Sequence, residues 1–554
     1  MRIKILMLAT LLIHFSFLAF TQPFINEVNY FKKVDSLQAP PKEPILFIGS
    51  SSFTNWKDVQ DYFPSHTLLN RAFGGSSLPH LILYAEDIIF RYNPKQILIY
   101  CGENDLTGGP TINADSILFR FQRLHSLIRS RLPKVPIVYL SMKPSPSRRK
   151  YLPTMQEGNA KIKAFIADQA HTKFIDIYSS MISNSGEINA SIFLSDSLHM
   201  NKKGYELWQP LIEPILEKPM LNYFTLSNSR IRLVGRADYS SVNYPRVWAS
   251  GSYVEFNFKG SACKLDITDE QRWGNYQNYI SVVIDGQPAR RLKLNGKRSR
   301  ITLAENLKPG VHHVTICKDT ESGIGYIQFN GVLCKGLAPL RKAPVKKIEV
   351  VGNSITCGMG SDMTAIPCKT GQWYDQHNAW NSYGALTARA FKAQWHLTAE
   401  SGIGLFKSCC NKPYVMPTVF DKINVNKDSI PWDFNKYQPD LVIAELGQND
   451  GLQDITTFCK AYILFIKKIR SLYPKATIAL LNSPMADNTL KNFLDRSILS
   501  IYQSLAAEGE KNIISYSFKK QYIAGCDNHP SLEEHTEIAK ELISFLRKEL
   551  KWKS

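Results

Sequence analysis

The pattern of apolar and polar residues changes twice along the chain. In the first and last parts, short apolar runs alternate with longer segments of helical periodicity. This rhythm favours a parallel sheet with helices on its faces. In the middle part, apolar and polar residues alternate with period two between Gly, Asp, Asn and Pro, which is typical of an antiparallel sandwich. The sequence therefore predicts two α/β modules separated by a β-sandwich.

The apolar runs and helical segments place the main elements of both α/β modules. In the first module, strands are predicted at 45–48, 96–100, 135–140 and 174–177, and helices at 114–132 and 204–216. In the last module, strands are predicted at 348–351, 441–446 and 477–481, and helices at 384–391, 456–471 and 532–552.

Linkers rich in proline and charge separate these parts, at 217–219 and 337–344. A chain of 554 residues is also too long for one ordinary core. We therefore expect an N-terminal domain at 22–218, a sandwich domain at 219–342 and a C-terminal domain at 343–554.

The first 21 residues have a basic start, an apolar run and a small-residue site, as a secretory signal peptide has. An uncleaved membrane anchor is the alternative. The first cysteine is Cys101, so none follows the signal directly to carry a lipid, and no later run is long and apolar enough to span a bilayer. We expect an exported protein, periplasmic or extracellular.

The net charge of +19 comes from scattered Lys and Arg residues. Without a basic block, this charge favours no nucleic-acid partner, although an affinity for anionic polysaccharide or cell surfaces stays open. The ten cysteines form no CxxC pair, which argues against a metal ribbon. Cys409 and Cys410 are adjacent, and the sequence settles no disulfide pairing and no oligomeric state.

Four short blocks in the C-terminal module carry the parts of an ester-hydrolysing site. Ser354 follows a strand in VVGNSITCG, Gly402 lies in SGIG, and Asn449 follows a strand in LVIAELGQNDG. Asp527 and His529 precede the last helix in AGCDNHPS. A nucleophilic serine, a histidine base with an orienting partner, and oxyanion donors from Gly and Asn are what acyl transfer needs.

The N-terminal module contains the same series in the same order. LFIGSSSFT supplies Ser51, with Ser50 and Ser52 as alternatives. The other members are Gly75, Asn104, Asp196 and His199. A repeat of four blocks at strand ends predicts two active sites in one chain.

Blocks of this kind, in the order Ser, Gly, Asn and His, resemble the SGNH or GDSL-type hydrolases. That resemblance implies two flavodoxin-like modules, a Ser-His-Asp centre, esterase, deacetylase or lipase activity, and no metal or organic cofactor. The G-x-S-x-G elbow of the α/β-hydrolases and the H-E-x-x-H zinc motif are both missing.

A sandwich followed by VGNSITCG, SGIG, LGQND and GCDNHP is similar to the acetylesterases of carbohydrate esterase family 2. This resemblance covers residues from about 219 onward and implies removal of O-acetyl groups from xylan- or mannan-type polysaccharides. Two departures from that pattern matter. Asp527 lies two residues before His529, so a backbone carbonyl is the alternative orienting group. Asn528 stands where the family often has Trp, and we expect it among the substrate-binding residues.

Several readings stay open. The aromatic residues after the nucleophile blocks fit either sugar stacking or packing; they are Trp56, Trp373, Trp380 and Tyr383. The sandwich either binds carbohydrate or braces the C-terminal cleft. His535 is expected on a solvated helix face. One rival function is an esterase for lipids, lysophospholipids or other short-chain esters. The other is a glycan-binding protein with one or both hydrolase modules inactive.

Overall fold

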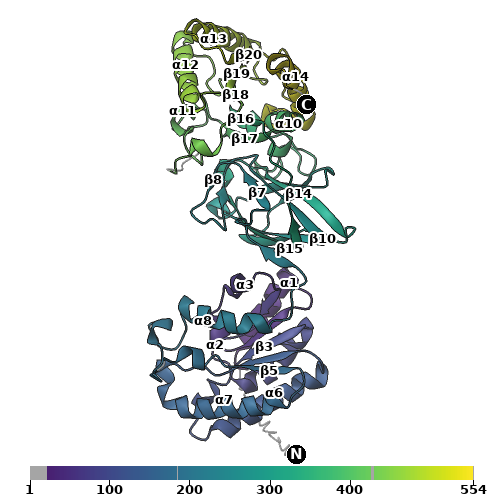
Figure 1. The fold of residues 1–554 in the computed structure, drawn as a ribbon, viewed down its shortest axis with the longest axis vertical. Helices are drawn as coiled ribbons and strands as arrows, with labels where there is room; N and C mark the ends of the chain where they lie inside the picture. The colour runs from purple at the N-terminus through teal and green to yellow at the C-terminus, as the bar shows by residue number, and fades with distance from the viewer. Residues whose placement is uncertain (1–21, 184, 426–429, 553–554) are drawn as a thin grey trace, which may run out of the picture. The chain divides into compact units, whose positions relative to one another are not determined.

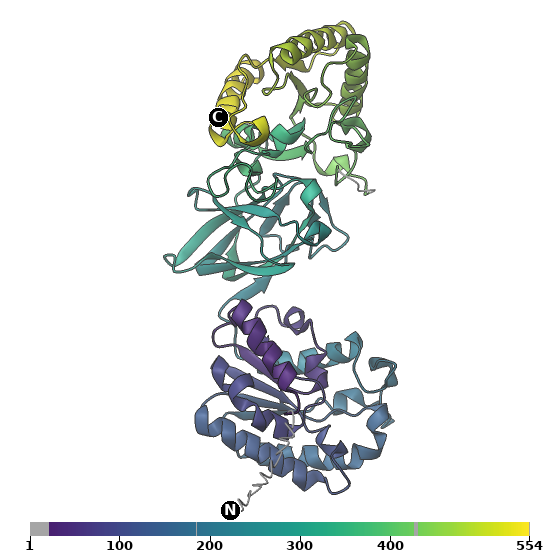
Figure 2. The ribbon, with the colours of Figure 1, turned by 180° about the vertical axis from the view of Figure 1, so that it is seen from behind.

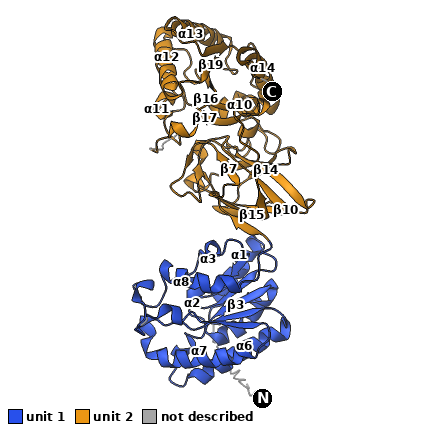
Figure 3. Ribbon diagram, viewed as in Figure 1, with its two compact units in different colours: residues 1–220 blue, residues 221–554 orange. Residues whose placement is uncertain are grey.

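The structure is a computed structural model that describes residues 22–183, 185–425 and 430–552. The chain divides into two compact units, Met1–Met220 and Leu221–Ser554 (Figure 3). The predicted signal peptide lies outside the described residues. Within the described ranges, no helix has both the length and the apolar character needed to cross a membrane.

Unit 1 is built on a five-stranded parallel sheet with the order β2-β1-β3-β4-β5 (Figure 1). This is the flavodoxin-like order, in which ligands bind beyond the carboxyl ends of the strands. The strands are β1 (Ile45–Gly49), β2 (Leu68–Asn70), β3 (Gln96–Tyr100), β4 (Ile137–Leu140) and β5 (Thr172–Ile175).

Helices cover both faces of this sheet because alternate strand residues point in opposite directions. One face packs against α1 (Ile25–Leu37), α6 (Ala114–Arg131) and α7 (Leu152–Ala167). The other face packs against α8 (Lys202–Ile212) and an aromatic cluster. Helix α1 is the purple helix in Figure 2.

Unit 2 begins with an antiparallel β-sandwich. Its longest strand, β10 (Tyr253–Asp269), pairs with β7 and β14 in its first half and with β13 in its second half, and β15 runs along it. The remaining strands are β6 (Asn222–Phe224), β7 (Ile231–Val234), β8 (Ala237–Asp238), β9 (Arg246–Val247), β11 (Tyr279–Ile284), β12 (Arg290–Lys293), β13 (Arg298–Ala304), β14 (Gly310–Lys318) and β15 (Ile327–Ala338).

The second parallel sheet repeats the strand order of the first, as β17-β16-β18-β19-β20. Its strands are β16 (Lys347–Gly352), β17 (Gln394–Ala399), β18 (Leu441–Glu445), β19 (Thr477–Leu481) and β20 (Ile513–Tyr516). Helices α12 (Ile455–Leu472) and α13 (Asn488–Ala507) cover one face. Helices α10 (Tyr383–Ala390) and α14 (Leu532–Leu550) cover the other.

Short helices fill the connections. They are α2 (Ser51–Thr54), α3 (Val59–Tyr62), α4 (Leu78–Leu83), α5 (Ala85–Ile88), α9 (Ser354–Cys357) and α11 (Met416–Val419). With this architecture, the fold predicted from the sequence is confirmed: two flavodoxin-like modules and a sandwich between them in the chain.

Within unit 2, the sandwich has a core of its own, and three of its residues, Val234, Tyr253 and Cys317, also join a core of the second parallel sheet. Tyr253 of the sandwich stacks on Trp395 of β17, with ring centroids 4.1 Å apart. Trp395 also donates a hydrogen bond from its indole N–H to the carbonyl of Gly251, at 3.0 Å. The buried Arg236 of the sandwich forms an ion pair of 2.7 Å with Glu349 of β16. These contacts fix the sandwich against the sheet that carries the C-terminal site.

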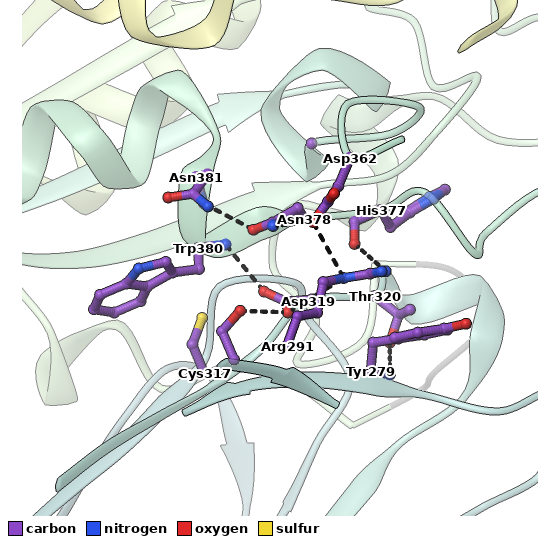
Figure 4. A network of polar contacts seen from close by, with 12 residues as sticks. Tyr279, Arg291, Cys317, Asp319, Thr320, Asp362, His377, Asn378, Trp380 and Asn381 are labelled. Atoms are coloured by element: carbon purple, nitrogen blue, oxygen red, sulfur yellow. Dashed lines mark hydrogen bonds and ion pairs between the residues drawn. The ribbon is translucent and has the colours of Figure 1, made fainter. Parts of the chain in front are cut away.

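A second set of polar contacts joins the same two parts (Figure 4). Asp319, just after β14, accepts a hydrogen bond from the backbone N–H of Trp380 at 3.1 Å. Arg291 of β12 donates to the carbonyl of His377 at 2.6 Å. Residues 377–380 are therefore held by side chains of the sandwich.

Candidate active sites

Each predicted nucleophile is the first residue of a short helix. That helix follows the strand that is second from one edge of its sheet. Strand β16 ends at Gly352 and α9 begins at Ser354; β1 ends at Gly49 and α2 begins at Ser51. The first N–H groups of a helix have no partner inside the helix, so they can face a developing negative charge. The two modules thus present their serines in the same local structure.

Ser354 and His529 meet in the C-terminal module. The hydroxyl oxygen of Ser354 lies 2.8 Å from Nε2 of His529, and Nδ1 of His529 lies 3.0 Å from the backbone carbonyl oxygen of Asp527. A carbonyl oxygen only accepts, so Nδ1 carries the proton and the lone pair of Nε2 faces the serine hydroxyl. This geometry would allow His529 to take the proton of the Ser354 hydroxyl.

The loop that carries His529 is anchored on both sides. A disulfide joins Cys526 to Cys368, and the backbone N–H of Cys526 donates to the carbonyl of Gly360 at 2.8 Å. On the other side, α14 starts with a capping box in which Ser531 accepts from the N–H of Glu534. Asp527 itself is exposed and has a left-handed φ of 52°, which turns its carbonyl toward the imidazole.

Burial lowers the pKa of His529 below its ordinary value, because the charged imidazolium loses hydration. The carbonyl of Asp527 opposes this effect, and the charge of His377 adds to it. A lowered pKa keeps His529 neutral at neutral pH, which is the form that accepts a proton.

Gly402 and Asn449 lie beyond the ends of the two strands that flank β16. Asn449 donates from Nδ2 to the carbonyl of Ile403 at 2.9 Å, which places its amide beside the Gly402 loop. Gly402 has a left-handed φ of +79°, which favours glycine. Among the described residues, no hydrogen bond uses the backbone N–H of Gly402. This donor is therefore available to an oxyanion.

The N-terminal module repeats this arrangement. Asn104 donates from Nδ2 to the carbonyl of Ser76, the residue after Gly75, at 3.0 Å. Gly75 has a φ of +81°, and within the described ranges its backbone N–H also lacks a hydrogen-bond partner. The pairs Gly75–Asn104 and Gly402–Asn449 therefore occupy equivalent places.

The aspartate after each asparagine supports the glycine loop. Asp450 accepts from the backbone N–H groups of Leu405, Phe406 and Lys407, at 2.9, 2.6 and 2.9 Å. Asp105 accepts from the N–H of Leu78 at 3.0 Å. These two aspartates were not predicted as site residues, although each directly follows the asparagine of its block.

His199 has a different orienting group from His529. Its Nδ1 lies 2.6 Å from the carboxylate of Asp196, and Asp196 also accepts from the backbone N–H groups of Leu198 and His199, both at 2.9 Å. These hydrogen bonds lower the pKa of Asp196 to about 2, so it is a carboxylate. In the part of the chain that the structure describes, no hydrogen bond joins His199 to Ser51.

The three serines of LFIGSSSFT differ in exposure. Ser50 and Ser52 are buried, whereas Ser51 is half-buried. The hydroxyl of Ser52 is buried and finds no hydrogen-bond partner among the described residues. Of the three, Ser51 is the one a substrate can reach.

Two of the aromatic residues proposed for sugar stacking cannot do it. Trp56 is fully buried among Phe53, Tyr205 and Trp208, and Tyr383 is fully buried with its hydroxyl 2.9 Å from that of Thr356. The prediction that they bind substrate is wrong, because apolar packing after the nucleophile strand uses both rings.

The other candidates are placed differently. The guanidinium of Arg389 covers one face of the half-buried Trp380, 3.9 Å from the ring centroid. Trp373 is 39 % exposed and lies edge-on to His377. Asn528 is exposed beside His529, and its binding role stays a prediction.

His535 does not lie on a solvated face, so that expectation is wrong. Its side chain is fully buried, stacks on Tyr383 and accepts from the backbone N–H of Tyr383 at 3.2 Å. His535 therefore packs α14 against α10.

Comparison with known proteins places this architecture in a family. The model of the GDSL-like lipase/acylhydrolase family matches residues 44–207 and 350–512, and the model described as carbohydrate esterase 2 N-terminal matches residues 233–344. The chain belongs to the GDSL-like lipase/acylhydrolase family, with a family-2 carbohydrate esterase N-terminal domain between its two hydrolase modules.

Three relatives show how far the likeness extends. The cellulase/esterase CelE of Acetivibrio thermocellus is 31 % identical over 337 residues, covering 59 % of this chain and 40 % of that protein. This chain thus matches less than half of CelE. An acetylxylan esterase / glucomannan deacetylase of Cellvibrio japonicus is 30 % identical over 295 residues, covering 52 % of this chain and 80 % of the relative. The structure of a family two carbohydrate esterase from Clostridium thermocellum in complex with cellohexaose has 30 % identity and a TM-score of 0.54, covering 58 % of this chain and all of that one.

Proposed function

We propose that the chain is an exported carbohydrate O-acetylesterase that releases acetyl groups from xylan- or mannan-type polysaccharides. The observation that carries this proposal is the 2.8 Å contact between Ser354 and His529. The Gly402 and Asn449 donors follow the two strands that flank β16, which precedes Ser354. The relatives named as carbohydrate esterases support the substrate class. The predicted signal peptide supports export.

In the proposed mechanism, Ser354 attacks the acetyl carbonyl while Nε2 of His529 takes its proton. The N–H groups of Ser354 and Gly402 and the amide of Asn449 stabilise the oxyanion of the tetrahedral intermediate. His529 then protonates the sugar oxygen, which leaves. Water, deprotonated by the same histidine, hydrolyses the acyl-enzyme and releases acetate.

We propose the same steps for Ser51 and His199 in the N-terminal module, with Asp196 as the orienting carboxylate. The equivalent positions of Gly75 and Asn104 support this assignment. Because Ser51 and His199 share no hydrogen bond in the described structure, the proposal requires their contact to form when substrate binds.

The test is acetate release from acetylated xylan and acetylated glucomannan. The proteins to compare are the unmodified chain, Ser51→Ala, Ser354→Ala and the double variant. We expect each single variant to lose part of the release and the double variant to lose all of it. Release by the double variant at the rate of the unmodified chain would contradict serine catalysis, and no release by the unmodified chain would contradict the substrate class.

A cavity in unit 1 favours a second candidate for the N-terminal module, an esterase for larger acyl groups. The cavity has a volume of about 530 Å³ and is lined by Phe31, Val34, Thr54, Phe73 and Gly74 among others. Thr54 ends the helix that begins with Ser51, and Gly74 precedes Gly75.

Nitrophenyl esters of increasing chain length distinguish the two candidates. With Ser354→Ala, the acetylesterase predicts that acetate is the best substrate. The larger-acyl candidate predicts that the butyrate or octanoate ester is hydrolysed faster than the acetate ester. It also predicts that Val34→Phe, which places a larger side chain in the cavity, removes this preference.

A further inference from the structure

The loop after β14 of the sandwich reaches into the C-terminal site. Its Glu321 is buried, and its carboxylate accepts two hydrogen bonds from Ser401, one from the backbone N–H at 2.9 Å and one from the hydroxyl at 2.5 Å. Ser401 directly precedes Gly402. A side chain of the sandwich therefore holds the residue next to the proposed oxyanion donor.

The Glu321 loop is itself held firmly. The buried ammonium of Lys318 donates to the carbonyl of Thr320 at 2.6 Å and to that of Glu321 at 3.2 Å. Asp319, in the same loop, accepts from the N–H of Trp380 at 3.1 Å (Figure 4). The loop that carries Glu321 is thus held by contacts within the sandwich and by a contact to Trp380 of the C-terminal module.

The other side of Gly402 is held as well. The N–H of Cys409 donates to the carbonyl of Gly402 at 2.9 Å. Glycine rotates about its backbone more freely than any other residue, so its neighbours must define the direction of its N–H. The direction of the Gly402 N–H therefore depends on Ser401, which Glu321 holds, and on Cys409, which bonds the Gly402 carbonyl.

We propose that Glu321 is a positioning residue for the C-terminal site, which orients the Gly402 N–H toward the oxyanion by fixing Ser401. This inference rests on the proposed function of that site. It gives the sandwich a part in catalysis that differs from carbohydrate binding.

A carboxylate near an oxyanion would oppose the developing charge if it were uncompensated. Nε2 of the buried His377 lies 3.8 Å from Glu321, and Ser401 supplies two donors. Although burial raises the pKa of Glu321, these contacts with His377 and Ser401 lower it to about 2. The negative charge of Glu321 is therefore compensated, and the residue acts on the site through the hydrogen bonds that it accepts from Ser401.

The N-terminal module offers an internal comparison. Gly74 stands where the C-terminal module has Ser401. In the described part of the chain, no atom lies within 4 Å of the position that the first side-chain carbon on Gly74 would take. Among the described residues, no carboxylate accepts a hydrogen bond from Gly74 as Glu321 does from Ser401. The Glu321 effect is therefore expected at Ser354 and not at Ser51.

The experiment uses the full chain with Ser51→Ala, so that only the C-terminal site acts. Glu321→Ala, Glu321→Gln and Asp266→Asn are compared. Asp266 is a matched control: it is a buried carboxylate of the sandwich that pairs with Arg298 at 2.9 Å, on β10 and away from Ser401. The readouts are kcat and KM for 4-nitrophenyl acetate and acetylated xylan, and the rate at which a fluorophosphonate labels Ser354.

We expect Glu321→Ala to lower kcat and the labelling rate by about 10²-fold with little change in KM, as the loss of one oxyanion donor does. Glu321→Gln keeps an acceptor for Ser401 and should restore most of kcat. Asp266→Asn should keep kcat. Unchanged kcat in Glu321→Ala, no restoration in Glu321→Gln, or an equal loss in Asp266→Asn would each overturn the proposal.

The labelling rate separates this proposal from the proposed function. If the Ser51→Ala chain releases no acetate but Ser354 is labelled, the acetylesterase function fails and the Glu321 effect is still measured. If Ser354 is not labelled in the Ser51→Ala chain, both the function of this site and the positioning role are overturned.

Discussion

His529 is oriented by the backbone of Asp527 and not by its side chain: Nδ1 lies 3.0 Å from the Asp527 carbonyl oxygen. His199 is oriented by a carboxylate, with Nδ1 2.6 Å from Asp196. The chain therefore fixes the tautomer and direction of two histidines, which we propose as general bases, in two different ways.

This difference predicts opposite effects of removing the two carboxylates. Asp527→Asn keeps both the carbonyl and a residue that tolerates a left-handed backbone, so kcat of the C-terminal site should change by less than about threefold. Asp196→Asn should lower kcat of the N-terminal site on the order of 10³-fold or more, as loss of the orienting carboxylate does in other serine hydrolases. Each variant is measured with the other nucleophile changed to Ala. A large loss in Asp527→Asn would contradict backbone orientation.

The lowered pKa of His529 predicts the pH dependence of the C-terminal site. The histidine acts as a base only when neutral, and it is neutral above its pKa. Because burial lowers this pKa, kcat/KM in the Ser51→Ala chain should fall only at a pH below the ordinary histidine value of about 6.5. The check is a pH–rate profile with 4-nitrophenyl acetate. An acid limb centred above 6.5 would show that His529 is not the group that titrates.

The two asparagines should affect their own sites alone. Asn449→Ala should lower kcat at Ser354 by about 10²–10³-fold, and Asn104→Ala should do the same at Ser51. Steady-state kinetics of each variant, in chains with one active serine, provides the measurement. The matched controls are the same substitutions assayed at the opposite site, where a comparable loss would indicate damage to the fold.

The disulfide between Cys368 and Cys526 should support the position of His529. Replacing both cysteines with Ala removes a cross-link over 158 residues, and loss of such a link typically costs about 2–4 kcal/mol of unfolding free energy. We expect a lower Tm for unit 2, and a larger loss of kcat at Ser354 than at Ser51. Thermal unfolding and the two single-site assays test this. An unchanged Ser354 activity would mean that Gly360 and Ser531 suffice to hold the loop.

The ion pair between Arg236 and Glu349 should make a large contribution to the stability of unit 2. Both side chains are buried, and removing one partner of such a pair typically costs about 3–5 kcal/mol. Arg236→Ala should therefore lower the denaturant midpoint clearly. Arg232→Ala, which breaks a less buried pair with Glu255 on the same sandwich, should have a smaller effect. Equal effects of the two variants would contradict this argument.

The sequence predicts most of the fold because its main elements carry regular apolar patterns. The helix expected at 114–132 is observed as Ala114–Arg131, and the strand expected at 477–481 is observed as Thr477–Leu481. Helix α7 was not predicted. Its inner face buries Gly158 and Asn159 where apolar residues would give a clear pattern, and Asn159 bonds the backbone of Met142.

The sites were predictable as far as local blocks define them. Each predicted residue of the C-terminal site follows a strand or precedes a helix; they are Ser354, Gly402, Asn449 and His529. The sheet topology then brings Ser354 to His529, and Asn449 to the Gly402 loop. Glu321 could not be found in this way. It lies 80 residues from Ser401 in a loop of a different layer, and nothing in its surrounding sequence marks it.

The hydrophobic cluster to which both the sandwich and the second sheet contribute limits how this chain can be divided into parts. Tyr253 and Trp395 stack across the junction, and Arg236 pairs with Glu349, which lies on β16, the strand that precedes Ser354. A fragment starting at 343 would present these surfaces to water. Exchange of segments between relatives should therefore succeed only when residues 221–554 are exchanged as one unit. The same holds for fusion of the C-terminal module to another protein. The smallest unit that can be moved without exposing this interface is therefore larger than the hydrolase domain alone.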